Sequence, residues 1–199
     1  MNDPTAELAA ETEPPSRPTR RARLYGYLLI GGVVVCASGI AWVMLMVRCY
    51  EIPTGSMEPT IAPGDQVATL NVWRPESYDF RHGQLVIYVA DQRLARTPGS
   101  KVRYMHRILG VAGDTVRWDR NEFFRNGEKL EEPYILQSAA GFEAPRPDAL
   151  PAGIAGTSTV PPGHLFVVGD NRAASLDSRY LGSVPLTSVR GIFLFRYNL

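Results

Sequence analysis

A serine, a histidine and an aspartate stand in three separate segments of the sequence: Ser56 in EIPTGSMEPT, His106 in VRYMHRILGVAGD and Asp177 in GDNRAASLDSRYLGSVP. These residue types can act as a nucleophile, a general base and a group that orients the base, which is the chemistry of acyl transfer. A lone inward histidine is more often a structural core residue, and a serine in such a loop is more often part of a turn. Catalysis therefore depends on whether the segments meet in the fold.

The segment around Ser56 is expected to be a loop, because Pro53 and Pro59 forbid regular structure through it. Gly55 allows the backbone to approach a substrate closely. Met57 can anchor the loop on apolar surface while the neighbouring hydroxyl remains free.

The segment that contains His106 is expected to be a strand that ends in a turn at Gly113 and Asp114. Alternation along a strand puts Val102, Tyr104, His106 and Ile108 on one face, and Lys101, Arg103, Met105, Arg107 and Leu109 on the other. His106 is therefore predicted to face inward, among apolar neighbours.

The segment Gly169 to Pro185 is rich in side chains that hydrogen-bond their own backbone, which predicts a rigid polar loop. Ion pairs among Asp170, Arg172, Asp177 and Arg179 can fix this loop, which is a purely structural role. Asp177 is also a candidate to orient a histidine.

The segment Tyr25 to Val47 contains no charged residue over 23 positions. As a helix it reaches about 35 Å, enough to cross a hydrocarbon core of about 30 Å, and it is too long for the apolar part of a cleaved signal peptide. Arg17, Arg20, Arg21 and Arg23 precede it, whereas only Arg48 follows closely. This bias predicts a cytoplasmic N-terminus and an exported remainder.

Beyond this span, short runs rich in β-branched and aromatic residues alternate with Gly, Pro, Asp and Asn, which predicts a mainly β fold. The predicted strands are Gln66–Val72, Gln84–Val89, Val102–Val111, Thr115–Trp118, Leu165–Val168 and Gly191–Tyr197. Asn126 and Gly127 predict a type I′ hairpin, and Ser138 to Gly163 predicts a long loop. We expect a cytoplasmic tail (1–24), a transmembrane anchor (25–47) and an exported domain (48–199) with a smaller β and loop insertion at about 117–162.

GSMEPT, RILGVAGD and GDNRxxSxDSRxxGxVP, in this order behind an N-terminal anchor, resemble the type I signal peptidases over Tyr25 to Pro185. The resemblance implies a membrane-bound serine endopeptidase that removes signal peptides after small-x-small sequences. It also implies an open β fold in which the substrate adds as an extended strand to an exposed edge. Trp73 and Phe80 are candidates for an apolar lip that enters lipid, although the core is the slightly preferred place for both.

The sequence departs from the family pattern at the general base. The family uses a lysine immediately before an arginine, and here His106 precedes Arg107. Neither Lys101 nor Lys129 matches that position. A histidine, with a reference pKa of about 6.5, is largely neutral at pH 7, so the exchange is chemically workable. It resembles the endoplasmic-reticulum and archaeal branch of the family, in which a histidine base is supported by an aspartate, here Asp177.

The resemblance implies that Ser56 attacks, that His106 carries the proton and that Asp177 supports the imidazole. The oxyanion donors would be the Ser56 N–H and the Thr54 hydroxyl. Ser175 matches a family serine that hydrogen-bonds the lysine, and Ala173 and Ala174 replace a polar pair that often follows GDNR. The supporting residues by the same match are Gly55, Met57, Pro59, Arg107, Gly169, Asp170, Asn171, Arg172, Ser175, Ser178 and Arg179.

The net charge of +1 gives no reason to expect a nucleic-acid partner, and the sequence has no Cys/His cluster that predicts a metal site or cofactor. The expected partners are signal peptides of exported preproteins and membrane lipid, near the protein export channel of the bacterial cytoplasmic membrane. Two alternatives remain: a specialised peptidase of the same family, such as one that matures a pilin, or a catalytically silent homologue that binds peptides.

Overall fold

The computed structural model describes residues 19–89, 102–119, 122–135 and 155–197. The chain divides into two compact units, residues 1–43 and 44–199. The first unit contains most of helix α1 (Arg20–Met46), whose stretch Arg23–Met46 is long and apolar enough to cross a membrane. The expected apolar helix is therefore present and begins five residues before Tyr25, whereas its orientation and the domain boundaries stay predictions. Residues 1–18 of the expected tail lie outside the described residues.

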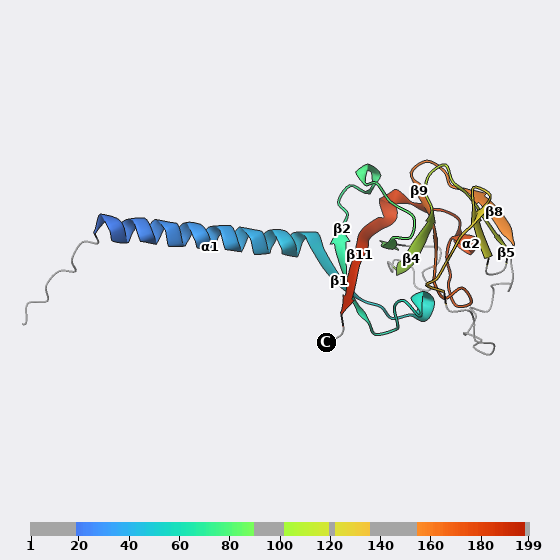
Figure 1. Ribbon diagram of the computed structural model, residues 1–199, viewed down its shortest axis with the longest axis horizontal. Coiled ribbons are helices and arrows are strands. Elements are labelled where there is room, and N and C mark those ends of the chain that lie inside the picture. The colour runs from blue at the N-terminus through green and yellow to red at the C-terminus, as the bar shows by residue number, and fades with distance from the viewer. Residues whose placement is uncertain (1–18, 90–101, 120–121, 136–154, 198–199) are drawn as a thin grey trace, which may run out of the picture. The chain divides into compact units, whose positions relative to one another are not determined.

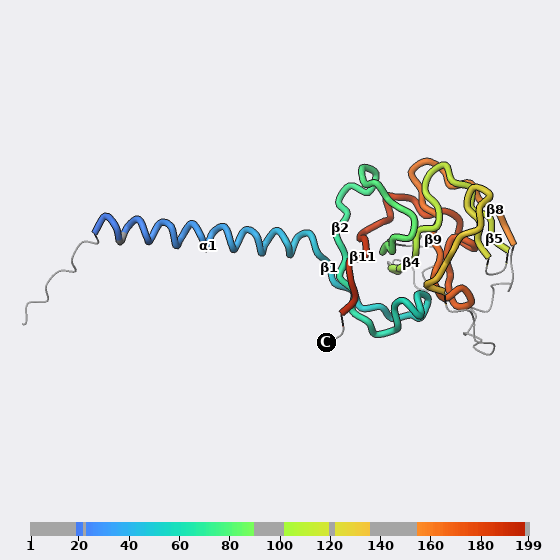
Figure 2. The backbone as a smooth tube through the Cα atoms, viewed as in Figure 1, coloured from blue at the N-terminus to red at the C-terminus, as the bar shows by residue number. Residues whose placement is uncertain are grey.

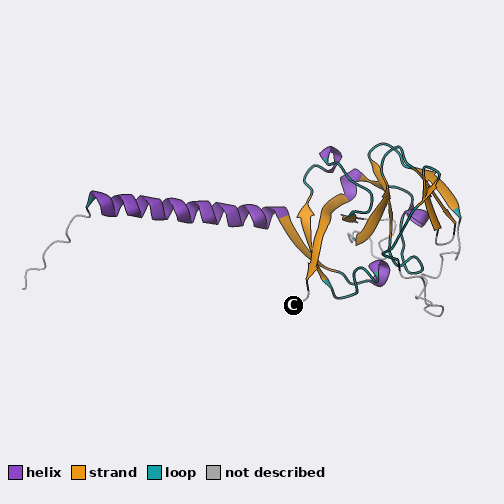
Figure 3. Ribbon diagram, viewed as in Figure 1, coloured by secondary structure: helices purple, strands orange, loops and turns teal. Residues whose placement is uncertain are grey.

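The second unit is mainly β, as predicted, and its described strands form two antiparallel sheets (Figure 1, Figure 3). The larger sheet has seven strands in the order β1 (Val47–Glu51), β2 (Gln66–Asn71), β11 (Val189–Tyr197), β3 (Leu85–Val89), β4 (Arg103–Gly110), β9 (His164–Val168) and β10 (Val184–Pro185). The smaller sheet has the order β7 (Glu128–Lys129), β6 (Glu122–Arg125), β5 (Thr115–Asp119) and β8 (Gly156–Thr159). Figure 2 lets the reader follow β11 from the end of the chain to its place beside β2.

The pairing of β3 with β4 decides which side chains share a face. Val86 lies opposite His106, Ile87 opposite Met105 and Tyr88 opposite Tyr104. Ile87 and Met105 belong to one buried apolar cluster, whereas Val86 and Tyr88 belong to another. Because directly opposite residues point to the same side of a sheet, His106 faces the cluster that contains Tyr88, as the alternation predicted.

The turn between β6 and β7 is the expected type I′ hairpin, since Asn126 and Gly127 both have positive φ, 53° and 90°. Three strands were not expected, and the shortest is β10, which lies within the segment expected to be a polar loop. β1 begins at Val47, where the sequence predicted the end of the span, and β8 lies within the expected loop Ser138–Gly163. The GTST sequence of β8 carries no apolar alternation, so its pairing with β5 is not visible in the pattern. Residues 136–154 of that expected loop lie outside the described residues.

The two aromatic residues considered for contact with lipid differ in their exposure. Phe80 is buried in the core, 8% exposed, so the core assignment is right for this residue. Trp73 is 62% exposed, so the core assignment is wrong for it. Trp73 lies in the segment that follows β2, outside the strand itself.

Candidate active site

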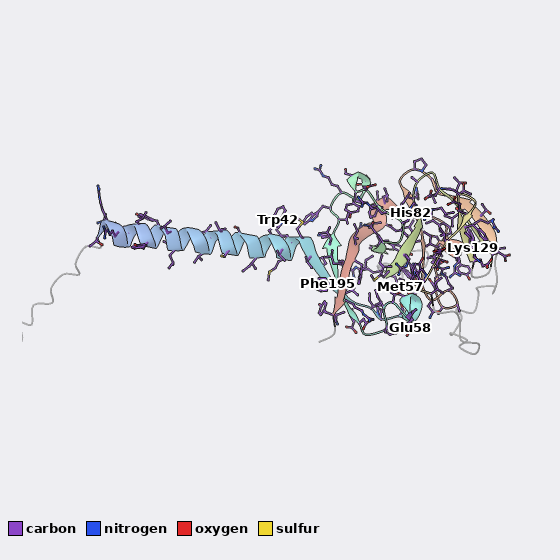
Figure 4. The ribbon with its side chains drawn as sticks, viewed as in Figure 1. Trp42, Met57, Glu58, His82, Lys129 and Phe195 are labelled. Carbon is purple, nitrogen blue, oxygen red and sulfur yellow. The ribbon has the colours of Figure 1, made fainter. Side chains whose placement is uncertain are left out.

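Ser56 lies in a single 3-10 turn, η1 (Gly55–Met57), as expected for a loop interrupted by prolines. Met57, labelled in Figure 4, is fully buried among apolar side chains that include Ile87 and Met105, which confirms that it anchors the turn. The Ser56 Oγ remains accessible and lies 3.5 Å from the Thr54 Oγ1. The peptide bond between Glu58 and Pro59 is cis.

The Ser56 turn docks directly onto the loop that follows β9. The Asn171 backbone N–H donates to the Ser56 carbonyl, and the Asn171 Nδ2 donates to the Gly55 carbonyl, both over 3.0 Å. A Cβ added to Gly169 would lie 2.2 Å from the Ser175 Oγ and 2.5 Å from the Ser56 carbonyl oxygen. Position 169 therefore requires glycine, because the Cβ of any other residue would clash with the Ser175 side chain and with the Ser56 carbonyl.

His106 is fully buried and both of its ring nitrogens have a partner. Its Nε2 lies 3.2 Å from the Ser175 Oγ, and its Nδ1 lies 2.9 Å from the Tyr88 hydroxyl. The Ser175 hydroxyl donates to the Asp177 Oδ2 over 2.6 Å. Ser175 thus bridges the imidazole and the carboxylate, so Asp177 is brought to the site but reaches His106 through a serine.

Asp177 is fully buried and held on several sides. Its carboxylate pairs with Arg179 over 2.8 and 2.9 Å and accepts from the Gly169 backbone N–H over 3.0 Å. Burial alone would raise the pKa of Asp177, but the Arg179 charge and the hydrogen bonds from Arg179 and Ser175 outweigh it, and the pKa lies below its ordinary value. Asp177 also caps α2 (Ser178–Leu181), and the Ser178 Oγ accepts from the Val167 N–H over 3.0 Å.

Burial lowers the pKa of His106 to about 4, even though the Asp177 charge opposes this shift. The sequence argument used the ordinary value for an exposed histidine and could not include this loss of hydration. His106 is therefore neutral at pH 7, as a general base must be, but it is a weaker base than its residue type alone indicates.

The remaining supporting residues form ion pairs that position these loops. Arg107 binds Asp170 through two hydrogen bonds of 2.8 and 2.6 Å, and the Thr60 hydroxyl donates to the same carboxylate. Arg172 pairs with Glu132, and Arg107 lies over the Tyr134 ring, 3.8 Å from its centroid. Asp170 and Arg172 thus each form an ion pair with a residue outside the segment Gly169–Pro185. Asp177 and Arg179 form an ion pair with each other, within that segment.

Three residues of this site were missed in the sequence. Glu132 and Tyr134 follow the hairpin in the run EEPY, which carries no periodic signal. Tyr88 stands in the strand LVIYV, where an aromatic residue is an ordinary core residue. Its contact with His106 depends on the register of β3 with β4, which a single sequence does not reveal.

A groove of about 270 Å³ opens beside Ser56. The extended segment Tyr50–Thr54 lines one part of it and the start of β4 lines another, and its apolar lining includes Ile52, Ile87 and Met105. Two nearly extended backbone segments therefore border a groove with a serine hydroxyl in its wall, a geometry that suits an extended peptide with short side chains.

Comparisons of the chain with a family model, with known sequences and with a solved structure all identify signal peptidases as similar proteins. Residues 25–198 match the family model described as signal peptidase, peptidase S26. A signal peptidase I of Bacillus licheniformis is 34% identical over 149 residues, which are 73% of this chain and 74% of that protein. A signal peptidase I of Bacillus amyloliquefaciens is 30% identical over 176 residues, 86% of this chain and 85% of that protein. A crystal structure of a signal peptidase I from Enterococcus faecalis aligns with a TM-score of 0.44 and 27% identity, covering 58% of this chain and 97% of that one.

Proposed function

Since this chain belongs to the signal peptidase family, peptidase S26, and is a serine endopeptidase that removes signal peptides, we propose that Ser56 is its nucleophile and His106 its general base. One observation carries this assignment. The Ser56 turn packs on Gly169 together with Ser175, and the Ser175 hydroxyl contacts the His106 Nε2. The Ser56 turn and the His106 ring, which come from segments distant in the sequence, thus both contact the loop after β9.

In the proposed reaction, the Ser56 Oγ attacks the scissile carbonyl while its proton passes to the His106 Nε2. The Ser56 N–H and the Thr54 hydroxyl, which lies 3.5 Å from the Ser56 Oγ, stabilise the oxyanion. The imidazolium then protonates the leaving amine, and water hydrolyses the acyl-enzyme. Asp177, ionised and one hydroxyl away from the imidazole, lowers the energy of the imidazolium through its charge.

The proposed substrate is an extended peptide that lies in the groove between the segment Tyr50–Thr54 and the start of β4. Side chains at alternate positions of such a peptide point into the groove, which is lined by Ile52, Ile87 and Met105. The limited volume favours small residues there, and the residue between them points away. This arrangement supports cleavage after small-x-small sequences.

We further propose that α1 anchors the enzyme in the bacterial cytoplasmic membrane with its N-terminus in the cytoplasm, since arginines crowd the residues before the apolar stretch. The peptidase domain is then exported and meets precursors as they leave the export channel. Trp73, which is exposed, is the remaining candidate for contact with lipid.

The test is cleavage of an Ala-x-Ala precursor in detergent micelles by the wild type, Ser56→Ala and His106→Ala. Each variant is expected to lose more than about 10³-fold in kcat/KM. In the wild type, kcat/KM should fall only as the pH approaches about 4, because that is the pKa of His106.

His82→Ala is the matched control, because His82 pairs with Asp114 away from Ser56 (His82 is labelled in Figure 4) and should leave the rate unchanged. Full activity in His106→Ala would remove the histidine from the mechanism. A folded wild type that binds the precursor but cleaves nothing at any pH would instead identify a silent homologue.

A further inference from the structure

The hydrogen-bond partners of Ser175 fix the protonation of the His106 ring. Ser175 has a single hydroxyl hydrogen, and an ionised Asp177 can only accept, so that hydrogen lies on the 2.6 Å bond to the Asp177 Oδ2. The Ser175 oxygen must then accept from the His106 Nε2, which therefore carries the proton. A neutral imidazole has one N–H, so Nδ1 is an acceptor and the Tyr88 hydroxyl donates to it.

The resulting chain of hydrogen bonds runs in one direction, from Tyr88 through His106 and Ser175 to Asp177. In this arrangement the basic lone pair of His106 lies on Nδ1 and faces Tyr88, whereas Nε2 donates its proton to Ser175. A base that takes the Ser56 proton on Nε2 must first carry its own proton on Nδ1. The partner of Nδ1 therefore controls whether the ring can act, and this partner is a phenol.

We propose that Tyr88 is the positioning residue of His106, with a hydroxyl that donates to Nδ1 in the resting enzyme and accepts Nδ1–H when Nε2 takes the proton of Ser56. This inference rests on the proposed role of His106 as the base. Tyr88 would thereby hold the place at Nδ1 that an aspartate holds in a Ser–His–Asp triad, while Asp177 acts at the Nε2 side through Ser175.

The proton count balances. In the change of tautomer, a water molecule takes the proton from Nε2 and another delivers one to Nδ1, so the ring, Tyr88 and Asp177 keep their charges while the Tyr88 hydroxyl rotates from donor to acceptor. The Ser56 proton then arrives on Nε2, and the imidazolium passes it to the leaving amine. Burial, together with the Asp177 charge, raises the pKa of Tyr88 well above its ordinary value, so Tyr88 stays a neutral phenol throughout.

The surroundings of His106 leave this role to Tyr88. The titratable groups that act on the ring are Tyr88 from β3, Tyr104 from β4 itself, and Asp170, Asp177 and Arg179 from the segment after β9. Asp170 is bound by Arg107, and Asp177 and Arg179 bind each other. Tyr104 lies beside the ring with centroids 5.8 Å apart, and it also lines the substrate groove.

The experiment compares Tyr88→Phe with Tyr78→Phe in the full chain, in detergent micelles. Tyr78 packs against the same apolar cluster as Tyr88 and serves as the control for loss of a phenolic hydroxyl. Tyr88→Phe is expected to lower kcat roughly 10- to 100-fold, the usual effect of losing an orienting hydrogen bond. KM should change little, because Tyr88 is not one of the residues that line the groove. Tyr78→Phe should match the wild type.

A second measurement separates positioning from packing. The chain has three histidines, so ¹⁵N-histidine NMR can resolve the ring nitrogens of His106, assigned by their loss in His106→Gln. The resting wild type should show a protonated Nε2 and a hydrogen-bonded Nδ1. In Tyr88→Phe the Nδ1 resonance should move toward that of an unbonded ring nitrogen, and in Tyr78→Phe it should not move.

The outcomes are distinct. A wild type that carries its resting proton on Nδ1 overturns the proposal without any variant, as does a Tyr88→Phe enzyme with unchanged kcat. A slow Tyr88→Phe enzyme with an unchanged Nδ1 resonance overturns it too, because tyrosine would then only fill space. If His106→Ala cleaves at the wild-type rate, the proposed base is wrong and the role of Tyr88 falls with it.

Discussion

The His106 ring is surrounded by protein on every side, and this affects folding as well as catalysis. In the unfolded chain the ring has a pKa of about 6.5, whereas in the folded domain it has a pKa of about 4. Between these values the unfolded state binds more protons, so the free energy of unfolding must rise with pH across this window. The full contribution is roughly 3 kcal/mol, reached above about pH 6.5.

Urea denaturation between pH 4.5 and 7.5 measures this contribution. We expect the wild type to gain stability as the pH rises and His106→Gln to show a flatter profile. Asp177 does not interfere, because its pKa is lowered and its contribution is lost only at more acidic pH. His82→Gln should keep the wild-type slope. Identical slopes in the wild type and His106→Gln would mean that the buried ring is hydrated in solution.

The sequence allowed some of these residues to be found and hid others. Ser56, His106, Ser175 and Asp177 stand in motifs whose spacing can be matched by inspection. The direct contact between Asp177 and the imidazole was inferred from resemblance, and the structure puts Ser175 between them. Tyr88 could not be found, because its role follows from a strand register and not from any local pattern.

At the scale of elements, the site depends on the contact between the η1 turn and the loop after β9. Gly169→Ala should separate them, since its Cβ would meet the Ser56 carbonyl, which is backbone and cannot rotate away. Overpacking of this kind costs about 1 to 3 kcal/mol. We expect a folded domain with a lower denaturation midpoint and a loss of kcat of about 100-fold or more, since displacement of a reacting group by about 1 Å has that effect.

The control for this variant is Ala173→Ser, an exposed position of the same loop. It should leave both kcat and the denaturation midpoint near the wild-type values. Wild-type kcat in Gly169→Ala would show that the turn and the loop can move apart without harm, and the docking contact would then have no part in catalysis.

The elements differ in how visible they are in the sequence. β2, β3, β4, β5, β9 and β11 were found because their β-branched and aromatic residues stand between turn residues. β1 was missed because VRCYE continues an apolar helix without a break residue. The helix ends there because the residues pair with β2 over the whole length of β1.

At the scale of the whole molecule, the two units should be separable at a defined residue. A chain that begins at Val47 keeps β1, whereas one that begins at Ile52 loses it and exposes the edge of β2. The first should unfold cooperatively, and the second should unfold about 10 °C lower, given about 0.5 to 1.5 kcal/mol for each lost hydrogen bond. Circular dichroism on heating measures both. Equal midpoints would mean that β1 belongs to the anchor and contributes nothing to the domain.

With His106 as the proposed base, the site also differs in the reagents with which it can react. Its two lysines are Lys101, outside the described residues, and Lys129, which pairs with Glu122 over 2.6 Å on the smaller sheet and is labelled in Figure 4. Neither stands where the family carries its neutral amine. An aldehyde inhibitor designed to form an imine with that amine cannot do so with His106. Imine formation requires a primary amine, and an imidazole is not one. A covalent inhibitor of the proposed site would therefore have to react with the hydroxyl of Ser56, since the described part of that site contains no lysine amine.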